Sequence, residues 1–193
     1  MNAIPKNLVY GLTKGKCEII GLSSVSADLW RDSSFQFTTT NSSDAMLLGA
    51  PIGRGGLDVA ITSQCSMLQL AARRLAFLSS HEALYLLKHS IAIPRLQYLL
   101  RTAPCFLSHE LRLYDHILFN TIMAITNTCL DSTALSQASL PVRWGGIGIR
   151  SACVLAPSAF ISSLRSSEVQ ISLLLPSRSS SYHDSLAEDA ITN

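Results

Sequence analysis

The sequence predicts a mainly α-helical protein in which a small β segment precedes a helical bundle. From Leu57 onward, apolar residues recur at intervals of three and four, the spacing of one helix face. The stretch 79–104 is the clearest case, because it opens with a capping box and is apolar around most of its circumference. Only short connections separate the helical segments, and short connections favour antiparallel neighbours. We therefore expect an antiparallel helical bundle over 57–165.

The segment 1–56 is predicted to be a small β piece. The apolar run 17–22 is typical of a strand, and the Ser/Thr-rich stretch 23–43 indicates a long loop or a short hairpin. A second strand is predicted over 46–50, followed by a glycine-rich turn over 51–56.

The first two helical segments lie between Leu57 and Pro104. Apolar residues on one face predict a helix near 57–78, and the stretch 79–104 predicts a helix pair near 80–103. Pro94 either kinks this second segment or opens a new helix as its first residue, because proline has no amide hydrogen and crowds the preceding turn.

The later segments are shorter. Ser108 is a candidate cap for a third helix that ends near Asn127, and Asp131 or Ser132 is expected to cap a helical turn through Ala138. A compact glycine turn is expected over 140–150 and a last helix near 150–165. The predicted parts are a β-containing segment (1–56), a helical domain (57–165) and a Ser-rich, polar, flexible tail (166–193).

The composition limits the function classes. Charged residues make up 15% of the chain, against roughly 25% in typical soluble domains, and the mean hydropathy is +0.29. This suggests that some surface faces another chain segment. The net charge of +2 does not by itself identify a nucleic-acid binder, so a basic patch must be argued locally.

The cysteines and the N-terminus indicate an intracellular protein, cytoplasmic or nuclear. The five cysteines are scattered and contain no C-x-x-C pair, and the chain opens without a signal-peptide pattern, so we expect reduced thiols. Lysine, histidine, proline and arginine interrupt the most apolar stretches, so no membrane association is expected.

Two clusters invite a ligand hypothesis. Cys105, His109 and His116 suggest zinc, but a structural zinc site needs four ligands, and no fourth is evident. We therefore expect no metal and no cofactor.

The glycine turn leaves two interpretations open: an anion cradle built from backbone amides, or a bend on which Trp144 packs against the helices. We expect the second. The residues of this turn are Arg143, Trp144, Gly145, Gly146, Gly148 and Arg150.

Three segments resemble one protein family. L-L-G-A-P-I-G (47–53), H-E-A-L-Y-L-L-K-H-S-I-A-I-P-R-L-Q-Y-L-L-R-T-A-P (81–104) and Q-A-S-L-P-V-R-W-G-G-I-G-I-R-S-A (137–152) resemble the region after the polymerase palm in reverse transcriptases of non-LTR retrotransposons. G-L-T-K-G-K-C-E-I-I (11–20) is similar to the segment that closes the palm, although it is shortened and lacks the asparagine. The resemblance covers roughly 11–164 and implies the end of the palm, a primer-grip hairpin and a helical thumb.

The resemblance also implies roles for single residues. Lys16 matches a palm lysine that protonates the pyrophosphate leaving group, and we expect it to be inactive here. The primer-grip position is matched by Leu48, Gly49, Ala50, Pro51 and Ile52. The phosphate-contacting side of the thumb would be Arg73, Arg74, Lys88, Arg95 and Arg101. Because His81, Lys88 and Arg95 are spaced by seven residues, about two helical turns, they are predicted to share one narrow stripe.

The family's catalytic aspartates are missing. Reverse transcriptases hold two metal ions with one aspartate and an adjacent aspartate pair, and this sequence has no adjacent pair and no fingers region before Gly11. We therefore expect a fragment that is not an enzyme and has no catalytic residue. Its residual capacity would be weak, non-specific binding of an RNA or DNA template–primer duplex.

Two alternatives remain open. The low charge and high hydropathy also suit a helical protein–protein interaction module, which would self-associate or meet a separate polypeptide that carries the palm and fingers. The third possibility is a non-functional retrotransposon remnant, which keeps the sequence pattern but does not fold stably.

Overall fold

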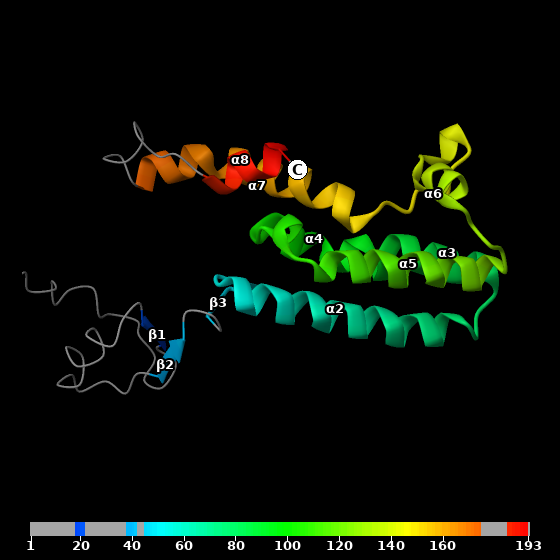
Figure 1. The fold of residues 1–193 in the computed structure, drawn as a ribbon, viewed down its shortest axis with the longest axis horizontal. Coiled ribbons are helices and arrows are strands. Elements are labelled where there is room, and N and C mark those ends of the chain that lie inside the picture. The colour runs from blue at the N-terminus through cyan, green and yellow to red at the C-terminus, as the bar shows by residue number, and fades with distance from the viewer. Residues whose placement is uncertain (1–17, 22–37, 42–44, 175–184, 193) are drawn as a thin grey trace, which may run out of the picture. The chain divides into compact units, whose positions relative to one another are not determined.

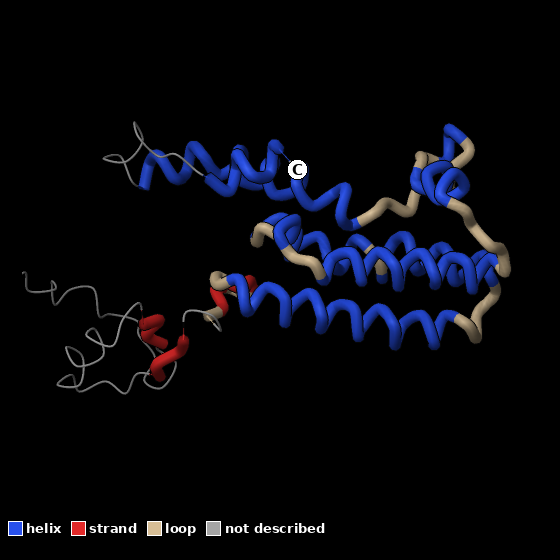
Figure 2. The backbone as a smooth tube through the Cα atoms, viewed as in Figure 1, coloured by secondary structure: helices blue, strands red, loops and turns tan. Residues whose placement is uncertain are grey.

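The computed structural model describes residues 18–21, 38–41, 45–174 and 185–192 (Figure 1). The chain divides into two compact units, 1–56 and 57–193, and each is described by itself. The predicted fold class is confirmed, because helices dominate and a small β hairpin precedes them (Figure 2). No helix in the described part of the chain is long and apolar enough to cross a membrane.

The first unit contains two small strand pairs. β1 (Glu18–Gly21) confirms the strand predicted over 17–22. It pairs in parallel with β2 (Thr38–Asn41), with Glu18 opposite Thr38. The two strands therefore do not form a tight hairpin, which requires antiparallel neighbours. Three consecutive β-branched threonines favour the extended conformation of β2.

The second pair is a hairpin. β3 (Met46–Leu47) and β4 (Ala50–Pro51) are antiparallel, and the turn between them consists of Leu48 and Gly49. Both turn residues have positive φ, 51° and 83°, as in the turns that match the twist of paired strands. The continuous strand predicted over 46–50 is therefore wrong, because the chain reverses in its middle.

The second unit is a set of helices whose successive members reverse direction at most connections (Figure 1). Its elements up to the glycine turn are α2 (Arg54–Leu75), α3 (Ser80–Leu86), η2 (Leu87–Ile91), α4 (Ile93–Thr102), η3 (Cys105–Leu107), α5 (Glu110–Thr126), α6 (Ser132–Ser139) and η4 (Val142–Trp144). They are followed by α7 (Ala152–Leu174) and α8 (Ser185–Thr192).

The predicted capping box opens α3. The Ser79 hydroxyl accepts from the Glu82 amide at 3.4 Å, and the Glu82 carboxylate accepts from the Ser79 amide at 3.2 Å. Hydrogen bonds from the Ser79 hydroxyl and amide lower the pKa of Glu82. The two amide contacts, from Glu82 to the Ser79 hydroxyl and from Ser79 to the Glu82 carboxylate, define the capping box.

Pro94 breaks the helix pair as predicted. The turn before it, η2, is a π-helix in which the Ala92 amide donates to the Leu87 carbonyl at 2.9 Å, five residues back. A proline at position 94 has no amide hydrogen, and its ring would clash with the carbonyl four residues earlier in a continuous helix. The backbone leaves the helical conformation at Ala92, with φ −74° and ψ −114°, which removes this conflict, and α4 then begins with Pro94 in its first turn.

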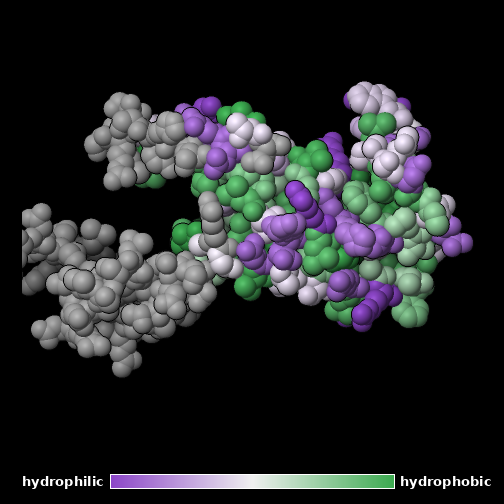
Figure 3. Space-filling model, viewed as in Figure 1, coloured by the Kyte–Doolittle hydropathy of each residue, from purple (hydrophilic) through white to green (hydrophobic). Residues whose placement is uncertain are grey.

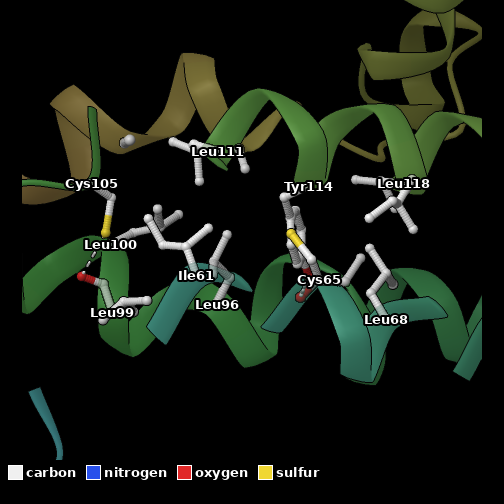
Figure 4. Packing of buried hydrophobic residues seen from close by; sticks show 14 of the residues in the cluster. Ile61, Cys65, Leu68, Leu96, Leu99, Leu100, Cys105, Leu111, Tyr114 and Leu118 are labelled. Atoms are coloured by element: carbon white, nitrogen blue, oxygen red, sulfur yellow. Dashed lines mark hydrogen bonds between the residues drawn. The ribbon is translucent and has the colours of Figure 1, made fainter. Parts of the chain in front are cut away.

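The core of this unit lies between α2, α4 and α5 (Figure 4). The Tyr114 hydroxyl donates to the Ala92 carbonyl at 3.0 Å, which ties α5 to the helix break. The Cys105 thiol donates to the Leu99 carbonyl at 3.3 Å, and burial raises its pKa to about 12. The largest fully buried side chains are Tyr114, Ile61, Leu87, Leu96, Leu100, Leu111, Leu118, Ile122 and Cys105.

The end of the chain is more helical than predicted. The last helix was expected near 150–165, but α7 continues to Leu174, and α8 lies alongside it (Figure 1). Serine hydroxyls within α7 donate to carbonyls three or four residues back, as Ser167 does to Ser163 at 3.0 Å. A Ser-rich stretch can therefore remain helical. These helices replace the predicted tail over 166–174 and 185–192, and residues 175–184 lie outside the described part.

Candidate nucleic-acid interface

A groove of about 750 Å³ lies where the break between α3 and α4 faces the start of α7. Residues of the glycine turn and of the first turn of α4 both line it. The lining residues are Lys88, His89, Ala92, Ile93, Pro94, Gln97, Gly148, Ile149, Arg150, Leu155, Ser158, Ala159 and Ser162. This set contains three basic side chains and no carboxylate.

Lys88 is positioned by the π turn and by a glycine. Gly148 has φ +78°, and a Cβ added there would lie 2.8 Å from Nζ of Lys88. Any larger residue would therefore have a strained backbone and would displace the ammonium group. The neighbouring His89 also lines the groove, and its ring packs against that of Tyr85 in a tilted arrangement, with 4.6 Å between centroids and 41° between the ring planes.

Arg150 reaches the groove from the lead-in to α7. The preceding Ile149 is buried in the core, which fixes the backbone next to Arg150. The Arg150 side chain itself is exposed. Ser158 and Ser162 follow on α7, one helical turn apart, and also line the groove, although the Ser158 hydroxyl donates to the Leu155 carbonyl at 3.0 Å. The groove therefore offers cations together with the neutral side chains of Ser162 and Gln97.

A buried carboxylate holds the start of α7. Asp115 on α5 accepts from the amide of Ala152 at 2.6 Å, from the amide of Cys153 at 3.0 Å and from the hydroxyl of Ser151. These contacts satisfy amides that a helix N-terminus leaves without partners. Burial and the nearby Asp115 charge raise the pKa of Cys153 to about 12, so its thiol stays protonated and is not an activated nucleophile.

The groove cations have no acidic partner within salt-bridge distance among the described residues. The one salt bridge seen in the described ranges joins Arg165 to Glu168 at 3.4 Å. Four other carboxylates of the helical unit accept from nearby serine or helix N-terminal groups. These contacts are Asp58 with Ser108, Glu82 with Ser79, Asp115 with Ser151 and Asp131 with Ala134. Lys88 and Arg150 are thus left to interact with solvent or with a ligand.

The structure separates the predicted basic residues. Arg73 and Arg74 lie exposed at the end of α2, and Arg95 and Arg101 lie exposed on α4, whereas only Lys88 of this set lines the groove. The π turn changes the number of residues per turn, so the seven-residue spacing no longer keeps one stripe.

His89 and Arg150 complete the basic lining, and the sequence reasoning did not assign His89 to the site. Pro94 is the sequence feature that could have indicated His89. A proline inside an apolar helical run indicates a break, and a break exposes groups on the preceding turn. Arg150 was noted only as part of the glycine turn.

The primer-grip-like residues form the β3–β4 hairpin of the first unit. Leu48 stands at the tip with 89% of its surface exposed, while Pro51 is buried. Gly49 takes the second left-handed position of the turn, and Ala50 and Ile52 follow it. Lys16, the palm-like lysine, lies outside the described residues.

Trp144 does not pack on the helices as expected. It ends η4 with 63% of its surface exposed, and the Arg143 guanidinium carbon lies 4.8 Å from its ring centroid. On the face drawn in Figure 3, hydrophobic surface likewise alternates with hydrophilic patches over the helices. The expectation was wrong because Ile149, and not Trp144, supplies the buried anchor of the turn.

The residues of the zinc hypothesis have other contacts. Cys105 is buried against the Leu99 carbonyl, and a ring nitrogen of His116 lies 2.9 Å from the Asn120 amide nitrogen. Within the described ranges, no group of three or more histidine, cysteine or acidic side chains is arranged to hold a metal ion.

No protein-family model, curated protein or solved structure matches this chain. The resemblance to reverse transcriptases therefore stays a prediction from motifs.

Proposed function

We propose that the helical unit binds the sugar–phosphate backbone of RNA or DNA through this groove, as the thumb-like resemblance implies. One observation carries the proposal: Lys88 and Arg150 line a concave surface from which carboxylates are absent, and neither has an acidic partner in the described chain. A cationic concavity with unneutralised charge favours a polyanionic ligand.

The groove chemistry predicts the kind of binding. Contacts from lysine and arginine to phosphates carry no information about the base sequence. The Ser162 hydroxyl and the Gln97 amide can also donate to phosphate oxygens. Such contacts release counterions from the nucleic acid, so the affinity should fall steeply with salt and depend little on sequence. With few cations, the binding should be weak.

The proposal includes no catalytic step. The sequence has no adjacent aspartate pair to hold two metal ions, so the chain would act as a non-enzymatic binding module. Scattered cysteines without a C-x-x-C pair support an intracellular site of action. A separate polypeptide carrying palm and fingers is a compatible partner.

The test is fluorescence anisotropy with a labelled primer–template duplex across a salt series. We expect micromolar binding at low salt, with the slope of log affinity against log salt reduced by about one in Lys88→Gln and in Arg150→Gln. Arg165→Gln is the matched control, because Arg165 is exposed but already paired with Glu168. Its slope should stay at the parental value.

Two results would overturn the proposal. The first is a protein that is helical by circular dichroism yet binds no duplex at low salt. The second is binding that Lys88→Gln and Arg150→Gln leave as unchanged as Arg165→Gln does.

Self-association is the second candidate function, and α2 favours it. Val59 and Leu70 lie on the side of α2 opposite its buried residues, and Phe77 lies in the turn that follows α2. These side chains are 71%, 50% and 90% exposed. We propose that a second copy covers this apolar strip. Light scattering should then give a dimer mass that Phe77→Ser reduces to the monomer, whereas a parental monomer at high concentration would contradict it.

A further inference from the structure

We infer that Trp144, together with Arg143, is a stacking site for an unpaired base beside the groove. The inference rests on the proposed function and narrows it to nucleic acid with a single-stranded part. The Trp144 indole is exposed, and it is not among the side chains that line the groove.

The turn holds Trp144 on a fixed backbone. The Trp144 amide donates to the Pro141 carbonyl at 2.9 Å, and the Gly148 amide donates to the Ala138 carbonyl at 3.0 Å. Gly146 packs so closely that an added Cβ would lie 2.0 Å from the carbonyl oxygen of Leu140. The indole is therefore presented from a tightly constrained loop.

The ring is available to a ligand. A tryptophan normally buries a large apolar area, yet Trp144 leaves 63% of its surface exposed. The Arg143 guanidinium lies over the ring at 4.8 Å, which steadies the indole and places a positive charge beside it. Because Arg143 covers one face of the indole, a base would stack on the opposite face, with the cation near enough to meet the phosphate of the same nucleotide.

The stacking site is close to the groove along the chain. Trp144 precedes Gly148 by four residues, so their Cα atoms are at most about 14 Å apart, at ~3.3–3.6 Å per residue. Gly148 in turn contacts Lys88. One strand whose phosphates meet Lys88 and Arg150 can therefore place a neighbouring base on Trp144.

An unpaired base fits this arrangement better than a duplex or a protein. Bases within a duplex are stacked on each other, and their faces are not accessible, whereas unpaired bases stack on aromatic side chains without regard to sequence. The cationic groove beside the indole favours a polyanion over an uncharged protein surface.

Tryptophan fluorescence tests the inference directly. The chain has two tryptophans, so Trp30→Phe makes Trp144 the only indole. An oligothymidylate of about twelve nucleotides should quench its fluorescence, and a blunt-ended duplex should not. Trp144→Leu should weaken oligothymidylate binding about tenfold and duplex binding less than twofold.

Two further variants serve as controls. Val142→Ala is the matched control, because Val142 is 65% exposed on the same turn and should not affect either ligand. Trp144→Phe retains an aromatic face and should lose less affinity than Trp144→Leu. Both Trp144 variants should keep the parental circular dichroism spectrum.

The outcomes separate this inference from the proposed function. If both ligands bind through Lys88 but Trp144 is neither quenched nor needed, the stacking site is overturned and the groove stands. If no nucleic acid binds, both fail. If Trp144→Leu abolishes dimer formation and leaves oligothymidylate binding intact, the indole belongs to a protein contact and the inference is overturned.

Discussion

The two sides of the segment that leads into α7 differ in how their charges are compensated. On the buried side, Asp115 accepts from Ser151, Ala152 and Cys153. On the groove side, Lys88 and Arg150 have no acidic partner in the described chain. Only a few residues separate the two environments.

The difference shows where the fold needs its charges. A buried charge must be paired or hydrogen-bonded, because its removal from water is otherwise prohibitively unfavourable. An exposed cation is solvated by water and adds little to stability. Substitutions on the buried side should therefore change the free energy of unfolding, and substitutions on the groove side should change binding.

Replacing Asp115 should have the largest effect on stability. Asp115→Ala leaves two amides and a hydroxyl without their acceptor in a buried position, and each such loss destabilises by about 1–3 kcal/mol. We expect a loss of about 3 kcal/mol or more in the free energy of unfolding. Urea denaturation followed by circular dichroism measures it.

Asp131 provides the matched control for that variant. It caps α6 through the Ala134 amide at 2.7 Å, but it is exposed to solvent. Asp131→Ala should destabilise by only about 1 kcal/mol. Equal losses in the two variants would mean that burial does not distinguish the two caps.

Replacing Gly146 should have the next largest effect. Gly146→Ala would place a methyl group 2.0 Å from the Leu140 carbonyl oxygen, so the turn must move. Overpacking of this kind destabilises by about 1–3 kcal/mol, and we expect about 2. Gly145→Asn is the control, because nothing lies closer than 3.9 Å there and asparagine tolerates the left-handed conformation. A Gly146→Ala protein as stable as Gly145→Asn would contradict the tight turn.

The buried thiols should make stability depend on alkaline pH. Burial raises the pKa of Cys105 from 9.0 to about 12. Above pH 9 the unfolded chain releases this proton while the folded chain keeps it, so stability is full below pH 9 and falls between pH 9 and 12. At pH 10 the loss of stability due to Cys105 should be about 1.4 kcal/mol.

Denaturation at pH 7 and pH 10 measures this fall. Cys105→Ala should reduce the difference in the free energy of unfolding between pH 7 and pH 10, whatever it does to stability at pH 7. Cys129→Ala should not, because Cys129 is exposed. A difference that both variants leave unchanged would assign the alkaline loss to other groups, such as Tyr114, whose pKa burial also raises.

Much of the fold was predictable because the relevant signals are local. Ser79 and Glu82 are three residues apart, Asp131 immediately precedes its helix, and the apolar periods of α2 and α5 are contained within each segment. The structure confirms these elements, including the break before Pro94.

The site was harder to predict because it depends on contacts between distant residues. Asp115 meets Ser151 across 36 positions, and Lys88 meets Gly148 only after α4, α5 and α6 have intervened. No spacing rule along one helix reports such a contact. The exposure of Trp144 was missed for the same reason, since Ile149 takes the buried position that an aromatic residue would be expected to fill.

The smallest predicted effect tests whether the two sides of the α7 lead-in are independent. The Tyr114 hydroxyl donates to the Ala92 carbonyl beside the groove, but that carbonyl also accepts from the Arg95 amide at 3.2 Å. Tyr114→Phe therefore leaves no acceptor without a partner and should destabilise by only about 0.5 kcal/mol. Tyr85→Phe, at an exposed ring, should change stability less. If Tyr114→Phe also reduces the salt slope of duplex binding, the core positions the groove cations, and the separation of stability from binding is incomplete.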